Sequence, residues 1–131
     1  MENHLKVLIC DDSALIRKKL RNILEVCQCK NIEEAQNGLE AVEKANSFKP
    51  DLIFMDIVMP EKDGIEALEE IKREHPSMKV IMASSAGTQS HLKKALECGA
   101  DDFIQKPITL EAVTSIIEKA IKEEKEDSAH V

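Results

Sequence analysis

The sequence predicts an α/β fold in which a mostly parallel sheet of five strands is covered by five helices. Short apolar runs alternate along the chain with segments whose apolar residues recur at helical spacing, which is typical of βα units. The third run, residues 52–55, is continuously apolar, as expected for a strand buried on both faces of a parallel sheet. A length of 131 residues favours one domain.

The five strands are expected where the apolar runs lie. In chain order the runs cover residues 5–10, 31–36, 52–56, 78–83 and 102–105. The second run is the weakest, since Ile32 and Ala35 are its apolar residues, and we place it at an edge of the sheet. Pro60 cannot donate to a sheet hydrogen bond, so the third strand is expected to end near Asp56.

Amphipathic segments between and after these strands are expected to form the five helices. Their apolar faces contain Ile16, Leu20, Ile23 and Leu24; Leu39, Val42 and Ala45; Ile65, Leu68 and Ile71; Leu92, Ala95 and Leu96; and Val113, Ile116, Ile117, Ala120 and Ile121. Ser13 and Asp63 stand where a capping side chain is needed. Pro50 and Pro76 close the second and third helices, and the fifth begins near Leu110.

Composition argues against several classes of partner. A formal net charge of -7 disfavours nucleic acid and anionic membranes, and the absence of Trp and Tyr removes the best base-stacking side chains. No apolar run approaches the roughly 20 residues of a membrane helix, and the N-terminus lacks a signal segment, so we expect a cytoplasmic protein. The four cysteines and four histidines show no metal-binding spacing.

Polar side chains stand at the ends of four predicted strands. Asp11 and Asp12 follow the first strand, Asp56 ends the third, Ser84 follows the fourth and Lys106 follows the fifth. Because the carboxyl ends of parallel strands meet at one edge of a sheet, we expect these side chains to converge there. Taken singly, each has a structural interpretation as a turn, helix-terminus or solvated residue. Their joint occurrence favours a functional site.

Three converging carboxylates need a partner of opposite charge. Two unit charges about 4 Å apart repel by roughly 4 kcal/mol at an effective dielectric constant of 20. Either one carboxyl group is protonated or a divalent cation lies among them, and carboxylate oxygens suit Mg²⁺. With the cation bound, Asp56 could act as a nucleophile that accepts a phosphoryl group. The Lys106 ammonium and the Ser84 hydroxyl would then contact phosphate oxygens.

The motifs resemble those of the receiver domain of bacterial response regulators. They are VLICDDS at 7–13, MDIVMP at 55–60 followed by Asp63-Gly64, MASS at 82–85 and FIQKP at 103–107. The likeness covers residues 5–124 and is greatest to the single-domain chemotaxis regulators of that family. It implies a flavodoxin-like doubly wound sheet with strand order 2-1-3-4-5, an order for which this family is itself a standard example. We assign residues 1–125 to the receiver domain and 126–131 to a short polar tail.

The resemblance also implies roles for the residues that bind the metal ion and the phosphoryl group. Asp56 accepts the phosphoryl group from the phosphohistidine of a histidine kinase. Asp12, Asp56 and the backbone carbonyl of Val58 bind Mg²⁺, and Asp11 acts through water. Lys106 contacts the phosphoryl group.

Further implications concern the switch and the partners. The Lys106–Pro107 peptide bond is expected to be cis. Ser84 is the switch hydroxyl, and Phe103 is the aromatic residue that moves with it. A protein target binds the face formed by helix 4, strand 5 and helix 5. The chain is then a monomeric signalling domain that catalyses only its own phosphorylation and dephosphorylation.

The sequence departs from the receiver family at two positions, and other functions remain as alternatives. Val58 and Ala86 replace the polar side chains that many receivers use to position water, which predicts a long-lived aspartyl phosphate. A phosphorelay intermediate or another stand-alone adaptor is an alternative to a chemotaxis regulator. A haloacid-dehalogenase-type phosphatase would have its two Asp one residue apart, whereas Asp11 and Asp12 are adjacent. In a flavodoxin-like FMN carrier, the same two carboxylates would repel the phosphate.

Overall fold

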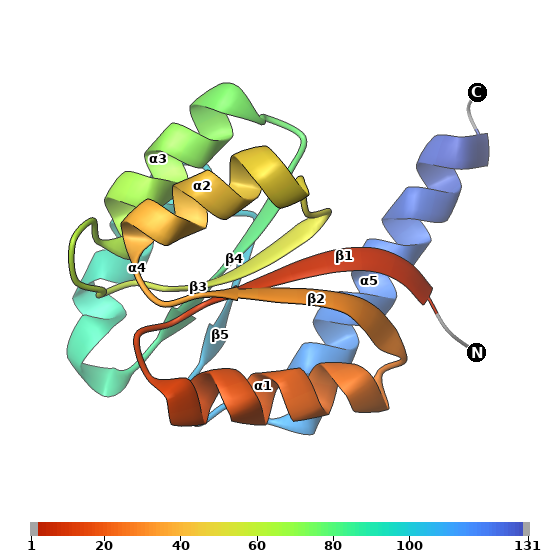
Figure 1. The fold of residues 1–131 in the computed structure, drawn as a ribbon, viewed down its shortest axis with the longest axis horizontal. Helices are drawn as coiled ribbons and strands as arrows, with labels where there is room; N and C mark the ends of the chain where they lie inside the picture. The colour runs from red at the N-terminus through yellow and green to blue at the C-terminus, as the bar shows by residue number, and fades with distance from the viewer. Residues whose placement is uncertain (1–2, 130–131) are drawn as a thin grey trace.

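The computed structural model describes residues 3–129 and forms a single five-stranded parallel sheet with helices on both faces (Figure 1). The strand order is β2-β1-β3-β4-β5, which confirms the predicted fold class and topology. The elements are β1 (Asn3–Cys10), α1 (Ala14–Val26), β2 (Cys29–Ala35), α2 (Gly38–Phe48), β3 (Leu52–Asp56), α3 (Gly64–Glu74), β4 (Lys79–Ser84), the 3₁₀ turn η1 (Ala86–Thr88), α4 (Gln89–Glu97), β5 (Asp102–Gln105) and α5 (Leu110–Ala129).

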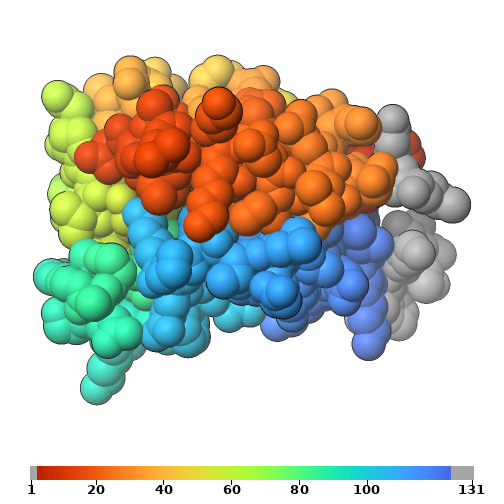
Figure 2. Space-filling view, turned by 90° about the horizontal axis from the view of Figure 1, so that it is seen from below, coloured from red at the N-terminus to blue at the C-terminus, as the bar shows by residue number. Residues whose placement is uncertain are grey.

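Helices α1 and α5 cover one face of the sheet, and α2, α3 and α4 cover the other (Figure 1). Figure 2 looks onto the first of these faces, where α1 and α5 lie side by side. Each face encloses its own apolar core, built from the buried sides of its helices and alternate residues of the strands. The sheet therefore separates two cores and is covered on both sides.

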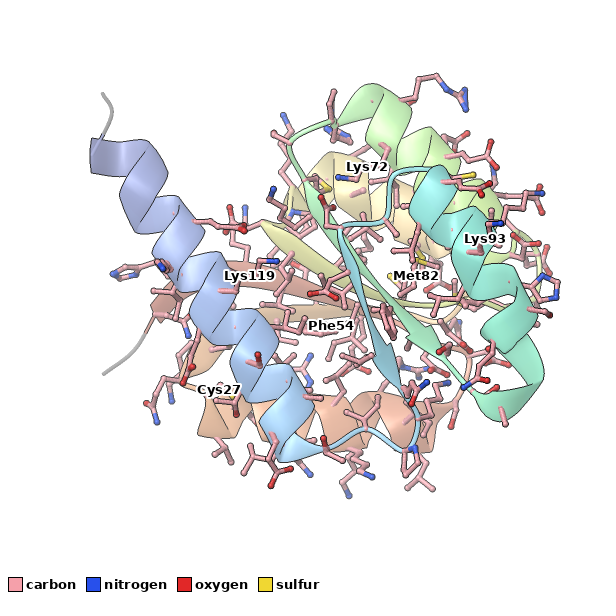
Figure 3. The ribbon with its side chains drawn as sticks, turned by 180° about the vertical axis from the view of Figure 1, so that it is seen from behind. Cys27, Phe54, Lys72, Met82, Lys93 and Lys119 are labelled. Atoms are coloured by element: carbon pink, nitrogen blue, oxygen red, sulfur yellow. The ribbon has the colours of Figure 1, made fainter. Side chains whose placement is uncertain are left out.

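The central strand β3 shows why its sequence is continuously apolar. Ile53 and Met55 pack into the core under α2, α3 and α4, while Leu52 and Phe54 pack into the core under α1 and α5. Figure 3 shows Phe54 and, from the neighbouring strand, Met82 on opposite sides of the sheet. Burial of each such side chain stabilises the fold by roughly 1.5–3 kcal/mol. A polar residue on either face would lose this contribution, so the pattern predicts the strand well.

The edge strand β2 is longer than the sequence predicts. It pairs with β1 alone, as expected, but it starts at Cys29 rather than at Asn31. Asn3 pairs with Cys29, and the Asn3 side-chain amide donates to the Cys27 carbonyl at 3.0 Å. Both strands therefore begin two residues earlier than the sequence predicts. The apolar pattern does not reveal this extension, because Asn3 is a polar residue.

Side-chain caps start the helices at the predicted positions. Ser13 Oγ accepts from the backbone N–H of Ile16 at 3.3 Å, and Asp63 Oδ1 accepts from that of Glu66 at 2.9 Å. The 3₁₀ turn Ala86–Thr88 lies between β4 and α4. It is held by Ser85, whose N–H donates to the Thr88 hydroxyl at 2.8 Å.

Helix α5 continues to Ala129, so most of the expected polar tail, residues 126–131, has a helical backbone. Residues 130 and 131 of that tail lie outside the described part of the chain. Between residues 3 and 129, no helix combines the length and the apolar character that crossing a bilayer requires.

The loop between β3 and α3 packs tightly against the end of β3. The Gly64 N–H donates to the Ile57 carbonyl at 2.7 Å, and a Cβ atom on Gly64 would lie 2.0 Å from the carbonyl oxygen of Asp56. Only a residue without a side chain allows this approach. The loop thereby fixes the backbone of Asp56, the residue on which the candidate site centres.

We predict that Gly64→Ala lowers the free energy of unfolding by roughly 1–3 kcal/mol, because the new methyl group must displace main-chain atoms. Gly87→Ala is the matched control, since a Cβ atom there meets nothing within 4 Å and should change stability by less than about 0.5 kcal/mol. Urea unfolding of both variants measures the difference. Equal stability of the two variants would contradict the tight packing of this loop.

Candidate functional site

The carboxyl ends of β1 and β3 bring three carboxylates together, as the sequence predicts. Asp11, Asp12 and Asp56 each offer an oxygen atom, and these oxygens lie within 4.8 Å of one another. Asp11 is buried, Asp56 is partly buried and Asp12 is exposed to solvent. The cluster is thus anchored on its protein side and open on the other.

Asp11 is held by both of its carboxylate oxygens. Oδ1 accepts from the backbone N–H of Ser13 at 2.9 Å, and Oδ2 accepts from Lys106 Nζ at 2.9 Å. The Asp11 N–H donates to the Ala35 carbonyl at 3.1 Å, which continues the pairing of β1 with β2 by one residue. These contacts fix the position of the Asp11 carboxylate.

Lys106 is the positive charge of the site. Its ammonium lies 2.9 Å from Asp11 Oδ2 and 3.4 Å from Asp56 Oδ1. Burial lowers the pKa of Lys106, but the hydrogen bond that Lys106 donates to Asp11 and the charge of Asp56 outweigh burial and raise the pKa above its ordinary value. Lys106 is therefore a permanent cation that offsets part of the negative charge of the cluster.

One lysine does not balance the site. The pKa of Asp56 is raised, first by burial and next by the negative charge of Asp11, and the nearby Lys106 only partly opposes these effects. The cluster thus retains a deficit of positive charge. Its donors are carboxylate oxygens, which are the ligands that Mg²⁺ prefers, and they lie close enough together to share one ion. The residues present fit a magnesium site.

Ser84 follows Ala83, the residue of β4 that pairs with Asp56. It is the last residue of β4 and only 1% exposed, and its Oγ atom has no hydrogen-bond partner among the described residues. The Ser84 carbonyl accepts from the Lys106 N–H at 2.7 Å, so the two residues are joined through the backbone. A buried hydroxyl without a partner is costly, and an oxygen of a bound anion would satisfy it.

Other residues that the sequence singles out lie outside the carboxylate cluster. The Phe103 side chain on β5 is 40% exposed, and the Val58 side chain in the β3–α3 loop is 55% exposed. The Lys106–Pro107 peptide bond is cis. The Val58 carbonyl as a metal ligand and Phe103 as a switch residue remain predictions.

Sequence reasoning missed one residue that contacts the site. The Arg17 guanidinium donates from Nη1 to the backbone carbonyl of Asp11 at 2.8 Å. Arg17 stands one helical turn after Ser13, where the sequence shows only a charged residue in an amphipathic helix. Its spacing from the Asp-Asp pair was the available signal, but many helices have an arginine there for other reasons.

Comparison with known proteins agrees with this geometry. The family model described as response regulator receiver domain matches residues 7–118. The chemotaxis protein CheY of Listeria monocytogenes is 46% identical over 118 residues, covering 90% of this chain and 99% of that protein. CheY of Bacillus subtilis is 43% identical, covering 88% and 97%.

Solved structures give the same result. The response regulator domain of Thermotoga maritima CheB is 41% identical with a TM-score of 0.78, covering 92% of this chain and 96% of that one. The receiver domain of AraT from Geobacillus stearothermophilus has a TM-score of 0.87 at 26% identity, covering 95% and 98%.

We predict that Asp56→Asn raises the free energy of unfolding at neutral pH without divalent ions, by roughly 0.5–2 kcal/mol, as is common when an unfavourable functional charge is removed. The raised pKa means that the ionised carboxylate destabilises the folded state. As pH falls through that pKa, the wild-type carboxyl takes up a proton and the difference should shrink.

Urea unfolding at a series of pH values measures this difference. Asp63→Asn is the control, because Asn caps a helix about as well as Asp and should leave stability nearly unchanged. A less stable Asp56→Asn protein at neutral pH would show that the charge is already compensated.

Proposed function

Because the chain belongs to the family of response regulator receiver domains and is closely related to CheY chemotaxis regulators, we propose that it receives a phosphoryl group on Asp56 from a histidine kinase. The observation that carries this proposal is the cluster of Asp11, Asp12 and Asp56, with the Lys106 ammonium 2.9 Å from Asp11 and 3.4 Å from Asp56. The buried Ser84 hydroxyl, which has no partner among the described residues, stands at the end of the adjacent strand β4. The proposed reaction takes place in the cytoplasm.

The transfer needs few protein groups. An Asp56 carboxylate oxygen attacks the phosphorus atom of the donor phosphohistidine, a P–O bond forms and the P–N bond breaks, and the imidazole leaves with the bonding electron pair. Lys106 keeps its charge and turns from Asp11 and Asp56 towards the phosphoryl oxygens. Ser84 donates its hydroxyl proton to one of these oxygens as a hydrogen bond.

Asp11, Asp12, Asp56 and the backbone carbonyl of Val58 would hold Mg²⁺, with Asp11 contributing through water. When bound, the ion supplies positive charge that screens the carboxylates from the incoming phosphoryl group and neutralises charge in the transition state. Asp56 is positioned for attack because Gly64 and the end of β3 fix its backbone.

Output is proposed to pass through protein contact at the face of α4, β5 and α5. Leu96 on α4 and Phe103 on β5 are exposed large apolar side chains on two of these elements, which favours a protein partner. A new charge near Ser84 would shift this face between two arrangements, with Phe103 moving as Ser84 engages the phosphoryl group. We propose a monomer whose target belongs to a chemotaxis or motility system, as the names of its CheY relatives indicate.

The chain should gain the mass of one phosphoryl group when incubated with acetyl phosphate and Mg²⁺, and the adduct should be sensitive to hydroxylamine, as acyl phosphates are. Intact-mass spectrometry measures this directly. Asp56→Asn and removal of Mg²⁺ by a chelator should each abolish the adduct, whereas Asp63→Asn should leave it intact. An adduct that persists on the Asp56→Asn protein would refute the assignment of the acceptor.

Slow loss of the phosphoryl group is the second expectation. Val58 and Ala86 offer no side-chain hydrogen bond to an attacking water, so we predict that Val58→Asn accelerates hydrolysis of the phosphorylated protein several-fold. Val58→Ala, which shortens the side chain without adding an amide, should leave the rate close to that of the wild type. Phosphate release after removal of the donor measures the rates. An unchanged or slower rate in Val58→Asn would count against this account of the water.

A further inference from the structure

We propose that Arg17 is a positioning residue for the metal site. Its guanidinium group links the backbone carbonyl of Asp11 to the carboxylate of Glu34 on β2 and so holds the loop that contains Asp11 and Asp12. This inference rests on the proposed magnesium site and adds a residue to it. Arg17 touches neither metal nor substrate in this proposal and acts only through the loop.

The two contacts of Arg17 point in different directions from one planar group. Nη1 donates to the Asp11 carbonyl at 2.8 Å, and Nε donates to Glu34 Oε1 at 2.9 Å. The Arg17 side chain is only 16% exposed. A guanidinium group has several donors in a rigid fork, so it can satisfy two acceptors at a fixed separation. Arg17 therefore bridges the start of α1, the end of β1 and the edge strand.

The Asp11 carbonyl lies where the sheet no longer provides donors. The last residue pair between β1 and β2 joins Cys10 to Ala35, and the Asp11 N–H still donates to Ala35. The chain then turns towards α1, so the next carbonyl needs another partner. Arg17 provides it. Because the peptide group is planar, fixing the Asp11 carbonyl also fixes the amide of Asp12 and the direction in which that residue leaves.

Glu34 is a firm anchor for this bridge. Its second oxygen, Oε2, accepts from Arg21 Nε at 2.7 Å, and Arg21 also donates to the Ile32 carbonyl at 3.2 Å. Burial raises the pKa of Glu34, but the hydrogen bonds and charges of Arg21 and Arg17 outweigh burial and lower it overall. We call Arg17, Glu34 and Arg21 the loop clamp. Of the three, Arg17 contacts the acidic loop, whereas the contacts of Arg21 are to Glu34 and Ile32 on β2.

A positioning role and a simple charge effect predict opposite results for metal binding. Arg17 is a cation beside an acidic cluster, so loss of its charge alone should strengthen binding of Mg²⁺. Loss of its contacts should instead release the loop and weaken binding. The direction of the change therefore distinguishes the two roles without any measurement of phosphorylation.

The test is a Mg²⁺ titration of the full chain, in which the NMR signals of the Asp11, Asp12 and Ser13 amides report binding. Arg17→Met should raise the dissociation constant about 10-fold, in line with the loss of an outer-shell partner. Arg21→Met, which removes an equal charge from the same clamp, should change it less than about 2-fold or tighten binding slightly. Arg17→Lys should weaken binding as Arg17→Met does, because one ammonium cannot bridge both acceptors.

Three outcomes overturn the proposal. Arg17→Met could bind Mg²⁺ as tightly as the wild type or more tightly, Arg17→Lys could restore binding fully, or Arg21→Met could weaken binding as much as Arg17→Met does. Circular dichroism confirms that each variant is folded, and the Arg17→Lys comparison decides the question if Arg17→Met does not fold. Absence of Mg²⁺ binding in the wild type is a different result, because it would remove the proposed metal site itself.

Discussion

Mutual repulsion among three carboxylates is the constraint on which the rest of the molecule depends. Asp11, Asp12 and Asp56 have oxygens within 4.8 Å of one another, and Lys106 contacts only two of the three. Burial, and next the negative charge of Asp11, raise the pKa of Asp56 above its ordinary value. Carboxylates held this close together favour either a shared proton or a divalent cation between them.

The fold makes this arrangement possible because the charged groups lie at one edge of a sheet that is packed between two apolar cores. Two cores, one on each face of the sheet, hold β1 and β3 side by side, so their carboxyl ends cannot move apart. Close packing of Gly64 fixes the backbone of Asp56. Arg17 restrains the Asp11 carbonyl on the other side. The backbones of Asp56 and Asp11 are thus held by residues that have no part in the proposed phosphoryl transfer.

Much of this structure follows from the sequence, and the reasons are physical. The apolar run of β3 determines a strand buried on both faces, and the parallel topology then brings Asp11, Asp56, Ser84 and Lys106 to one edge. Strand order came from family resemblance, because apolar patterns do not specify which strands are neighbours. The pattern also could not show that Lys106 contacts Asp11, or that Arg17 bonds to a backbone carbonyl. Such contacts depend on side-chain reach across elements, which spacing along the chain does not encode.

Lys106 offsets only part of the negative charge of the carboxylate cluster, and we propose that a divalent cation offsets the rest. Thermal unfolding with and without millimolar Mg²⁺ is the most direct test of this proposal, because an ion that binds only the folded state must raise Tm. We expect a higher Tm for the wild-type protein in Mg²⁺ and little or no change for Asp12→Ala. A Tm that does not respond to Mg²⁺, or one that rises equally in Asp12→Ala, would contradict it.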